Sequence, residues 1–192
     1  MAIPKLKEDK YSYADYLTWG DQERWEIIHG FAYAMSPAPG RKHQEVSSNI
    51  HRELSVFLKG KKCRVYAAPF DVRLAPAKTE DESVFNVVQP DISVFCDPLK
   101  LDDKGAIGAP DLVVEILSES TAWKDMNIKL LLYQEYGVKE YWIVDPGKEN
   151  LYVYQPDTKG LYKLIRIYSK EEKVQVGLFP ELTIDLAELF AE

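Results

Sequence analysis

PDISVF (residues 90–95), PDLVVEIL (110–117) and STAWKDMNIKLLLYQEYG (120–137) are the stretches that decide the fold. The first two predict buried strands that begin after a proline, because proline cannot donate to a strand ladder and favours strand starts. The third has the pattern of an amphipathic helix that begins at Ser120 or Thr121 and ends at Gly137. EYWIVD (140–145) follows as a further buried strand.

The segments before this region complete a core pattern. A helix is predicted from Arg41 to about Lys59, because VSSNIHRELSVFL (46–58) places apolar residues along one helical stripe. CRVYAAPFDVRL (63–74) predicts a bent or paired strand. The order is therefore helix, three strands, helix, strand, which indicates a mixed α/β class with a mixed central sheet.

Further elements flank this core at both ends. Ser12 is a plausible N-cap for a short N-terminal helix that ends at Gly20. RWEIIHGFAYAM (24–35) predicts a β-hairpin with Gly30 at its turn, and the loop SPAPG ends that unit. Residues 151–177 predict a C-terminal β-meander, and DLAELF (185–190) a final helical turn. At 192 residues, we expect residues 1–192 to form a single domain.

Composition sets limits on function. No apolar run approaches the length of a membrane span, and the start MAIPKLKEDK lacks the apolar core of a signal peptide, so we expect a cytosolic protein without membrane contact. The formal charge of −7 argues against a protein that coats nucleic acid, but it is compatible with a nuclease that has a local basic face. The candidates for that face, or simply for a solvated helix end, are Arg41, Lys42, Lys59, Lys61, Lys62 and Arg64.

The two cysteines, Cys63 and Cys96, lie far apart in the sequence and lack the spacing of metal ligands. They are predicted to be buried or half-buried thiols without a function.

Glu115 is the anomaly of the predicted strands. It lies among apolar residues, and a carboxylate buried there needs a cation or hydrogen-bond donors. Asp91 begins the neighbouring strand, and two carboxylates together could bind Mg²⁺ or Mn²⁺. Taken singly, Glu115 fits a salt-bridged residue and Asp91 a strand-entry residue. Asp111, in the second Pro-Asp pair, and Asp71 are less favoured alternatives for the second acid.

Lys129 could supply a cation near a scissile phosphate. It is four residues from both Asp125 and Tyr133, so all three lie on one helical face. The alternative is that Lys129 is exposed and forms only an ion pair with Asp125.

QPDISVF, PDLVVEILSEST and KDMNIKLLLYQEYGVKEYWIVDP resemble the Uma family of proposed restriction endonucleases, in the PD-(D/E)XK nuclease-like superfamily. The resemblance covers residues 10 to 190 or so and includes RWEIIHGFAYAMSPAPGRKHQEV. It implies a restriction-endonuclease-like αβββαβ core and a metal held by Asp91 and Glu115. The residue two after Glu115 is Leu117, so the family's lysine would be Lys129 on the following helix.

The resemblance also implies that Glu26 and His43 approach the metal site. Without it, Glu26 fits a hairpin surface residue and His43 an exposed residue at a helix start. His29 and His51 have no such support.

The resulting hypothesis is a Mg²⁺- or Mn²⁺-dependent nuclease that acts on DNA or RNA, with Asp91, Glu115 and Lys129 as its catalytic residues. The alternative is a non-catalytic or regulatory binding module that keeps the nuclease fold. Tyrosines of the meander, at 152, 154, 162 and 168, could form a homodimer interface or a hydrated outer face.

Overall fold

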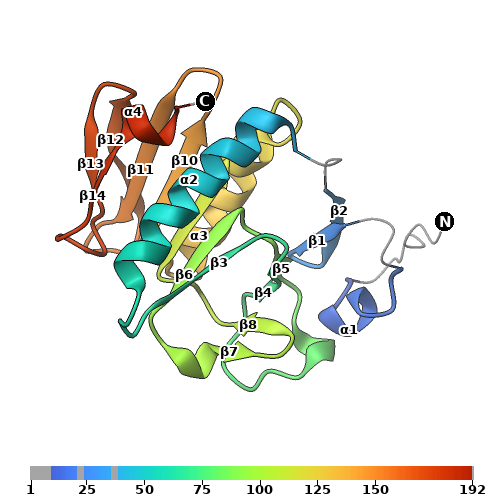
Figure 1. Ribbon diagram of the computed structural model, residues 1–192. Coiled ribbons are helices and arrows are strands. Elements are labelled where there is room, and N and C mark those ends of the chain that lie inside the picture. The colour runs from blue at the N-terminus through green and yellow to red at the C-terminus, as the bar shows by residue number, and fades with distance from the viewer. Residues whose placement is uncertain (1–9, 21–23, 36–38, 192) are drawn as a thin grey trace.

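The computed structural model describes residues 10–20, 24–35 and 39–191. The chain start MAIPKLKED and most of the SPAPG loop, at 36–38, lie outside the described residues. The protein is mixed α/β, as predicted, but it contains two six-stranded mixed sheets and a two-stranded sheet in place of one central sheet (Figure 1).

The main sheet has the strand order β12-β11-β10-β9-β6-β3, in which only β9 and β10 are parallel neighbours. Its strands are β3 (Arg64–Ala67), β6 (Ile92–Phe95), β9 (Leu112–Ile116), β10 (Glu140–Asp145), β11 (Asn150–Pro156) and β12 (Tyr162–Ser169). All residues of β9 are buried, Glu115 included, and its other residues are apolar.

Helices cover both faces of the main sheet (Figure 1). On one face, α2 (Arg41–Leu58) buries Val46, Ile50, Leu54 and Leu58, the stripe predicted from the sequence. On the other face, α3 (Leu130–Glu135) follows a π-helix, η3 (Lys124–Lys129). The order α2, β3, β6, β9, α3, β10 reproduces the predicted core. The helix predicted over 120–137 is present and ends before Gly137, but residues 124–129 within it are π-helical and not α-helical.

The second sheet has the order β2-β1-β5-β4-β8-β7. Its strands are β1 (Trp25–Ile28), β2 (Phe31–Ala34), β4 (Val72–Arg73), β5 (Val87–Val88), β7 (Leu101–Asp102) and β8 (Gly105–Ile107). The β1–β2 hairpin is as predicted, and Gly30 has φ +84° at its turn, a conformation that suits glycine. CRVYAAPFDVRL divides between the two sheets, with β3 in one and β4 in the other.

Short helices complete this half. α1 (Tyr13–Tyr16) begins at Ser12, which forms the predicted N-cap through a capping box with Asp15. The single turn η1 (Asp81–Ser83) connects β4 to β5 within the second sheet, and η2 (Pro98–Lys100) connects β6 of the main sheet to β7 of the second.

The C-terminal meander is confirmed for β11 and β12 but was wrong for KVQVG. β13 (Lys173–Gln175) pairs with β14 (Thr183–Asp185) and not with β12. The reason is apolar burial, because Val174, Ile184 and Leu186 join the core beneath α2. α4 (Leu186–Leu189) is the predicted final helical turn.

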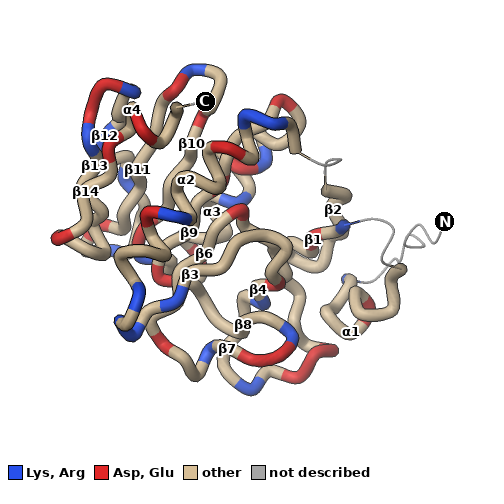
Figure 2. The backbone as a smooth tube through the Cα atoms, viewed as in Figure 1, with Lys and Arg blue, Asp and Glu red and all other residues tan. Residues whose placement is uncertain are grey.

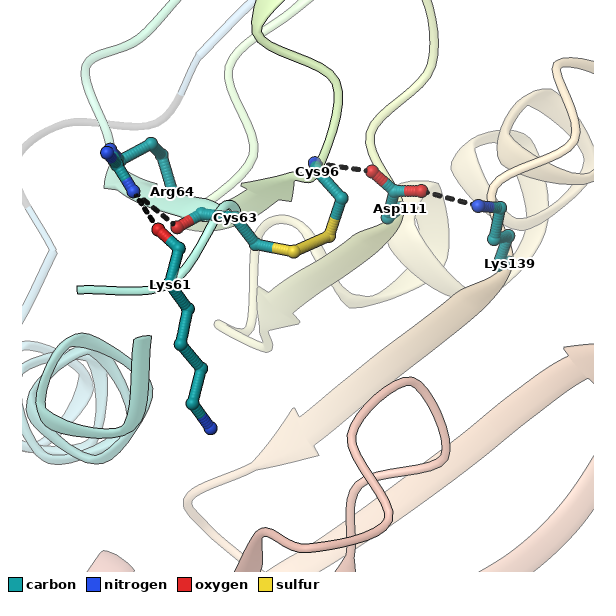
Figure 3. The surroundings of a disulfide bond; sticks show 6 residues. All are labelled: Lys61, Cys63, Arg64, Cys96, Asp111 and Lys139. Atoms are coloured by element: carbon teal, nitrogen blue, oxygen red, sulfur yellow. Dashed lines mark hydrogen bonds and ion pairs between the residues drawn. A yellow bond between two sulfur atoms is a disulfide. The ribbon is translucent and has the colours of Figure 1, made fainter. Parts of the chain in front are cut away.

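The prediction of two free thiols was wrong, because Cys63 and Cys96 form a disulfide (Figure 3). They directly extend the β3–β6 ladder, in which Arg64 pairs with Phe95, so the two residues lie opposite each other. The contact between the two cysteines could not be predicted from the sequence, because it depends on the register of two strands that lie far apart in the chain. Such a bond is rare in a reducing cytosol.

Among the described helices, none has the length and apolar character needed to span a membrane.

Candidate active site

A cavity of about 260 Å³ opens between the start of α2, η3 and the ends of β6 and β9. Five of the seven side chains singled out in the sequence line it: His43, Asp91, Glu115, Asp125 and Lys129. The other two, Glu26 and Tyr133, are fully buried and contact members of this group.

Asp91 and Glu115 are brought together by strand register. Ile92 of β6 pairs with Val114 of β9, so one step further along the antiparallel ladder places Asp91 opposite Glu115. Asp91 Oδ2 accepts a 2.7 Å hydrogen bond from the backbone N–H of Ile116, which fixes its carboxylate at the strand end. Glu115 is buried on the face opposite Val114 and Ile116, as the period-2 alternation predicts.

Lys129 points into the protein. Its Nζ lies 2.8 Å from Glu115 Oε1 and 2.7 Å from Glu26 Oε1, and the side chain is 3% exposed. Asp125 is also close, at 3.6 Å. The alternative of an exposed Asp125–Lys129 ion pair is therefore wrong, because both side chains are buried beside further carboxylates.

Glu26 comes from the second sheet. It is buried in β1, where the sequence without the resemblance suggested a surface residue, and its Oε2 lies 2.6 Å from Lys124 Nζ. Sequence reasoning missed Lys124, which also lines the cavity. In an α-helix, residues 124 and 129 would point about 140° apart. The i→i+5 repeat of the π-helix brings Lys124 and Lys129 to the same partner.

The charges in this cluster shift each other's pKa values. Burial alone would lower the pKa of Lys129, but Glu115, Glu26 and Asp125 raise it well above its ordinary value. Burial would raise the pKa of Glu26, yet Lys129 and Lys124 hold it below its usual value. Burial raises the pKa of Glu115 to about 8, with Lys129 opposing the shift and the other carboxylates adding to it. Lys129 is therefore an ammonium at neutral pH, and Glu115 binds a proton more readily than an exposed glutamate does.

His43 projects from the first turn of α2, and its Nε2 lies 3.3 Å from Asp91 Oδ2. Its side chain is 13% exposed, so the reading of an exposed helix-start residue was wrong. Burial would lower the pKa of His43, but its hydrogen bond to Asp91 and the charge of that residue raise it. His43 thus carries positive charge beside the cavity more readily than a free imidazole does.

Asp125 and Tyr133 complete the helical face predicted around Lys129. The Tyr133 hydroxyl donates a 2.6 Å hydrogen bond to Glu115 Oε1, and burial raises the pKa of this phenol well above its ordinary value. Burial also raises the pKa of Asp125. Glu115 Oε1 is consequently held by two donors, Lys129 and Tyr133.

The alternative acids lie elsewhere. Asp111 accepts hydrogen bonds from the backbone of Cys96 and from Lys139, beside the disulfide (Figure 3). Asp71 accepts from Tyr13, Tyr16 and Gln89. Neither lines the cavity.

The six basic residues proposed as one face are divided between the two ends of α2. Arg41 and Lys42 begin the helix near the cavity, whereas Lys59, Lys61, Lys62 and Arg64 follow its other end (Figure 2). Eighteen helical residues span roughly 27 Å, so these groups do not form one local surface.

The carboxylate oxygens at the cavity are of the type that a hard divalent cation binds. In the described part of the chain, no hydrogen bond occupies Asp91 Oδ1 or Glu115 Oε2, and buried Asp125 Oδ1 also has none. Carboxylate oxygens are the ligands that Mg²⁺ and Mn²⁺ prefer, with water completing the shell. Within the same described residues, no cluster of three or more His, Cys, Asp or Glu side chains could hold a metal by itself. A bound cation would therefore need ligands beyond the protein's carboxylates and imidazoles.

Comparison with known proteins gives consistent similarities. A family model described as "Uma2: Putative restriction endonuclease" matches residues 13–187. Two uncharacterized proteins of Synechocystis sp. are similar, one at 27% identity over 90% of this chain and 88% of its own, the other at 30% over 69% and 73%. The fold matches a crystal structure described as "a putative nuclease belonging to DUF820" from Anabaena variabilis, with a TM-score of 0.72, 22% identity, and coverage of 93% of this chain and 97% of that one.

Proposed function

The chain belongs to the Uma2 family, and from this premise we propose that it is a metal-dependent nuclease that hydrolyses phosphodiester bonds of DNA or RNA. Asp91 and Glu115 would hold Mg²⁺ or Mn²⁺. When bound, the ion would polarise a phosphoryl oxygen and offset its developing charge. The observation that carries the proposal is the position of Lys129, an ammonium buried against Glu115 at the inner wall of the cavity.

Lys129 has the properties of an electrostatic group. Because its pKa is raised, it keeps its proton at neutral pH and cannot act as a general base. Its three neighbouring carboxylates fix its position, so it needs no reorganisation when negative charge develops nearby. We therefore assign Lys129 to orienting the attacking water and stabilising the charge on the phosphate.

The surrounding groups support this arrangement. Glu26 forms an ion pair with Lys129, Tyr133 donates a hydrogen bond to Glu115, and Asp125 adds negative charge. Lys124 and His43 add positive charge around the cavity mouth, where an anionic substrate would enter. We place Glu26 and Tyr133 as positioning residues.

A nuclease assay tests the proposal. The protein is incubated with single-stranded and duplex DNA and RNA in Mg²⁺, in Mn²⁺ and in a chelator, beside the Lys129→Met variant. Cleavage that requires the metal and falls on the order of a hundredfold in the variant is expected. Absence of cleavage on every substrate, together with absence of Mn²⁺ binding, would instead favour the non-catalytic binding module.

We also propose a single domain over residues 1–192, a homodimer and a cytosolic location, in which the Cys63–Cys96 bond would have to resist reduction. Of the tyrosines considered for the interface, Tyr154 and Tyr162 pack near Tyr141 and are only partly available. The exposed apolar side chains of the edge strand β12 are Leu164, Ile165 and Ile167, which are 44–54% exposed. These residues are the better candidates for a contact between two copies. Light scattering measures the molar mass in solution. A mass of one chain at every protein concentration would exclude the dimer.

A further inference from the structure

Two hollows adjoin the cavity of the candidate site. The first, of about 380 Å³, is called the aromatic hollow here and is lined by Tyr16, Leu17, Trp19, Gly20, Arg24, Trp25, Pro69 and Gln89. The second, of about 320 Å³, runs along α2 and is lined by Ser47, Ser48 and His51 among others. Arg24 lines all three spaces, so they meet at its side chain.

Arg24 is held in place by the protein although it is exposed. Its Nε and Nη2 both donate to Gln89 Oε1, at 2.9 and 2.5 Å. Gln89 in turn donates to Tyr16 and Asp71, and its backbone N–H donates to Glu26 of the candidate site. A guanidinium fixed at this junction is suited to bind a phosphate that lies between the cavity and the aromatic hollow.

The aromatic hollow contains tryptophan rings that are only partly buried by the protein core. Trp19 and Trp25 are partly exposed, and their ring centroids lie 5.9 Å apart in an edge-to-face contact. Leu17 is 51% exposed. Among the described residues, no apolar core cluster includes Trp25. Partly exposed rings beside a fixed arginine are typical of surfaces on which unpaired bases stack.

From these contacts we propose that the aromatic hollow is a subsite for an unpaired nucleobase, and that the substrate is single-stranded nucleic acid. Arg24 binds the phosphate next to the scissile one, and Trp25 with Trp19 receives the adjoining base. This inference rests on the proposed nuclease function and names its substrate class.

A duplex does not suit this arrangement. Its bases are stacked on each other and offer their faces to no protein ring, whereas a single strand can place a base against Trp25. A protein that binds the phosphate backbone of a duplex would need basic residues on either side of the site. Lys59, Lys61, Lys62 and Arg64 instead follow the end of α2 that is far from the cavity. The second hollow is lined by Asp91 as well as by serines and His51, and the serines and His51 offer hydrogen-bond donors to the backbone of the same nucleic-acid strand.

Binding in the presence of a chelator tests the inference without cleavage. The probes are oligo(dT) and oligo(U) of about 12 nucleotides and a DNA duplex of equal length. Affinity is measured by fluorescence anisotropy for the wild type and for Trp25→Leu, Trp25→Phe and Arg24→Gln. Trp123→Leu and Arg52→Gln are matched controls, because both side chains are exposed and line none of the three spaces.

We expect the single strands to bind at least tenfold more tightly than the duplex. Trp25→Leu should weaken single-strand binding about tenfold, Trp25→Phe should restore most of it, and both controls should remain within about twofold. Arg24→Gln should weaken binding and reduce the salt dependence by about one counterion. A preference for oligo(dT) or oligo(U) separates DNA from RNA.

Equal or tighter binding of the duplex would overturn the inference, as would unchanged affinity in a folded Trp25→Leu protein. The two proposals fail separately. Single-strand binding that depends on Trp25, without cleavage in any metal, would refute the nuclease function alone. Metal-dependent cleavage with a duplex preference would refute the single-strand subsite alone.

Discussion

Glu26 Oε1 lies 2.7 Å from Lys129 Nζ, and this buried contact joins the second sheet to the helix that covers the main sheet. The candidate site is therefore assembled from both sheets. Carboxylates from β1, β9 and η3 surround its lysine and favour the charged form. The Lys129 ammonium therefore affects both the stability of the fold, through its buried ion pairs, and the proposed reaction at the site.

Replacing Lys129 by methionine should destabilise the protein as well as lower cleavage on the order of a hundredfold. The substitution leaves Glu26, Glu115 and Asp125 buried with less compensating charge, and breaking a buried pair in this way costs about 3–5 kcal/mol. Urea denaturation of Lys129→Met in a chelator measures this loss.

Lys163→Met is the matched control, because Lys163 is 66% exposed in its ion pair with Asp157. Its effect on the free energy of unfolding should be small beside that of Lys129→Met, because an exposed ion pair contributes little. Equal stability of the two variants would show that Lys129 is not held as the contacts indicate.

The part of the site that could be predicted from the sequence follows local periodicity. Alternation along β9 isolates Glu115 from Val114 and Ile116, and i,i+4 spacing joins Asp125, Lys129 and Tyr133. These relations depend on strand and helix repeats, which are visible in the residue order. The main core order was predictable for the same reason.

Other features depend on contacts that no local pattern encodes. Lys124 reaches Glu26 because η3 is π-helical, whereas an α-helical period directs it elsewhere. The Cys63–Cys96 bond follows from the register of β3 and β6. The second sheet consists partly of two-residue strands such as β4 and β5, which are too short to show alternation.

Asp91→Asn and Glu115→Gln should each abolish measurable Mn²⁺ binding while the fold persists. Each change removes one anionic oxygen donor but keeps the shape of the side chain. Isothermal titration calorimetry measures the affinity. Asp111→Asn provides the control, because it alters the other Pro-Asp pair, whose carboxylate contacts Cys96 and Lys139. Unchanged Mn²⁺ affinity in the first two variants, or its loss in Asp111→Asn, would refute the ligand assignment.

Reduction of the Cys63–Cys96 disulfide should lower stability by about 3–4 kcal/mol, since the bond constrains a loop that spans a sequence separation of 33. Thermal unfolding with and without reductant measures this effect, and Cys63→Ser should reproduce the reduced state. Alkylation of the unreduced, denatured protein should modify no cysteine. Ready alkylation of both residues in protein purified under air would contradict the pairing.

The free energy of unfolding should fall as pH rises from about 4.5 to about 8, through the titration of Glu115. Burial raises the pKa of this carboxyl to about 8 in the folded protein, whereas an unfolded glutamate ionises near its ordinary value of 4.5. Between these values the folded state binds one more proton than the unfolded state, so each pH unit lowers the free energy of unfolding by up to about 1.4 kcal/mol through this group.

Glu115→Gln cannot titrate at this position and should lack this pH-dependent contribution. The stability of the variant relative to the wild type should thus increase across the window and level off above pH 8 or so, as followed by urea denaturation in a chelator. A difference between the two proteins that stays constant from acid to neutral pH would mean that Glu115 is already ionised in the folded state. The buried carboxyl would then be a permanent anion paired with Lys129, and a cation could bind it without displacing a proton.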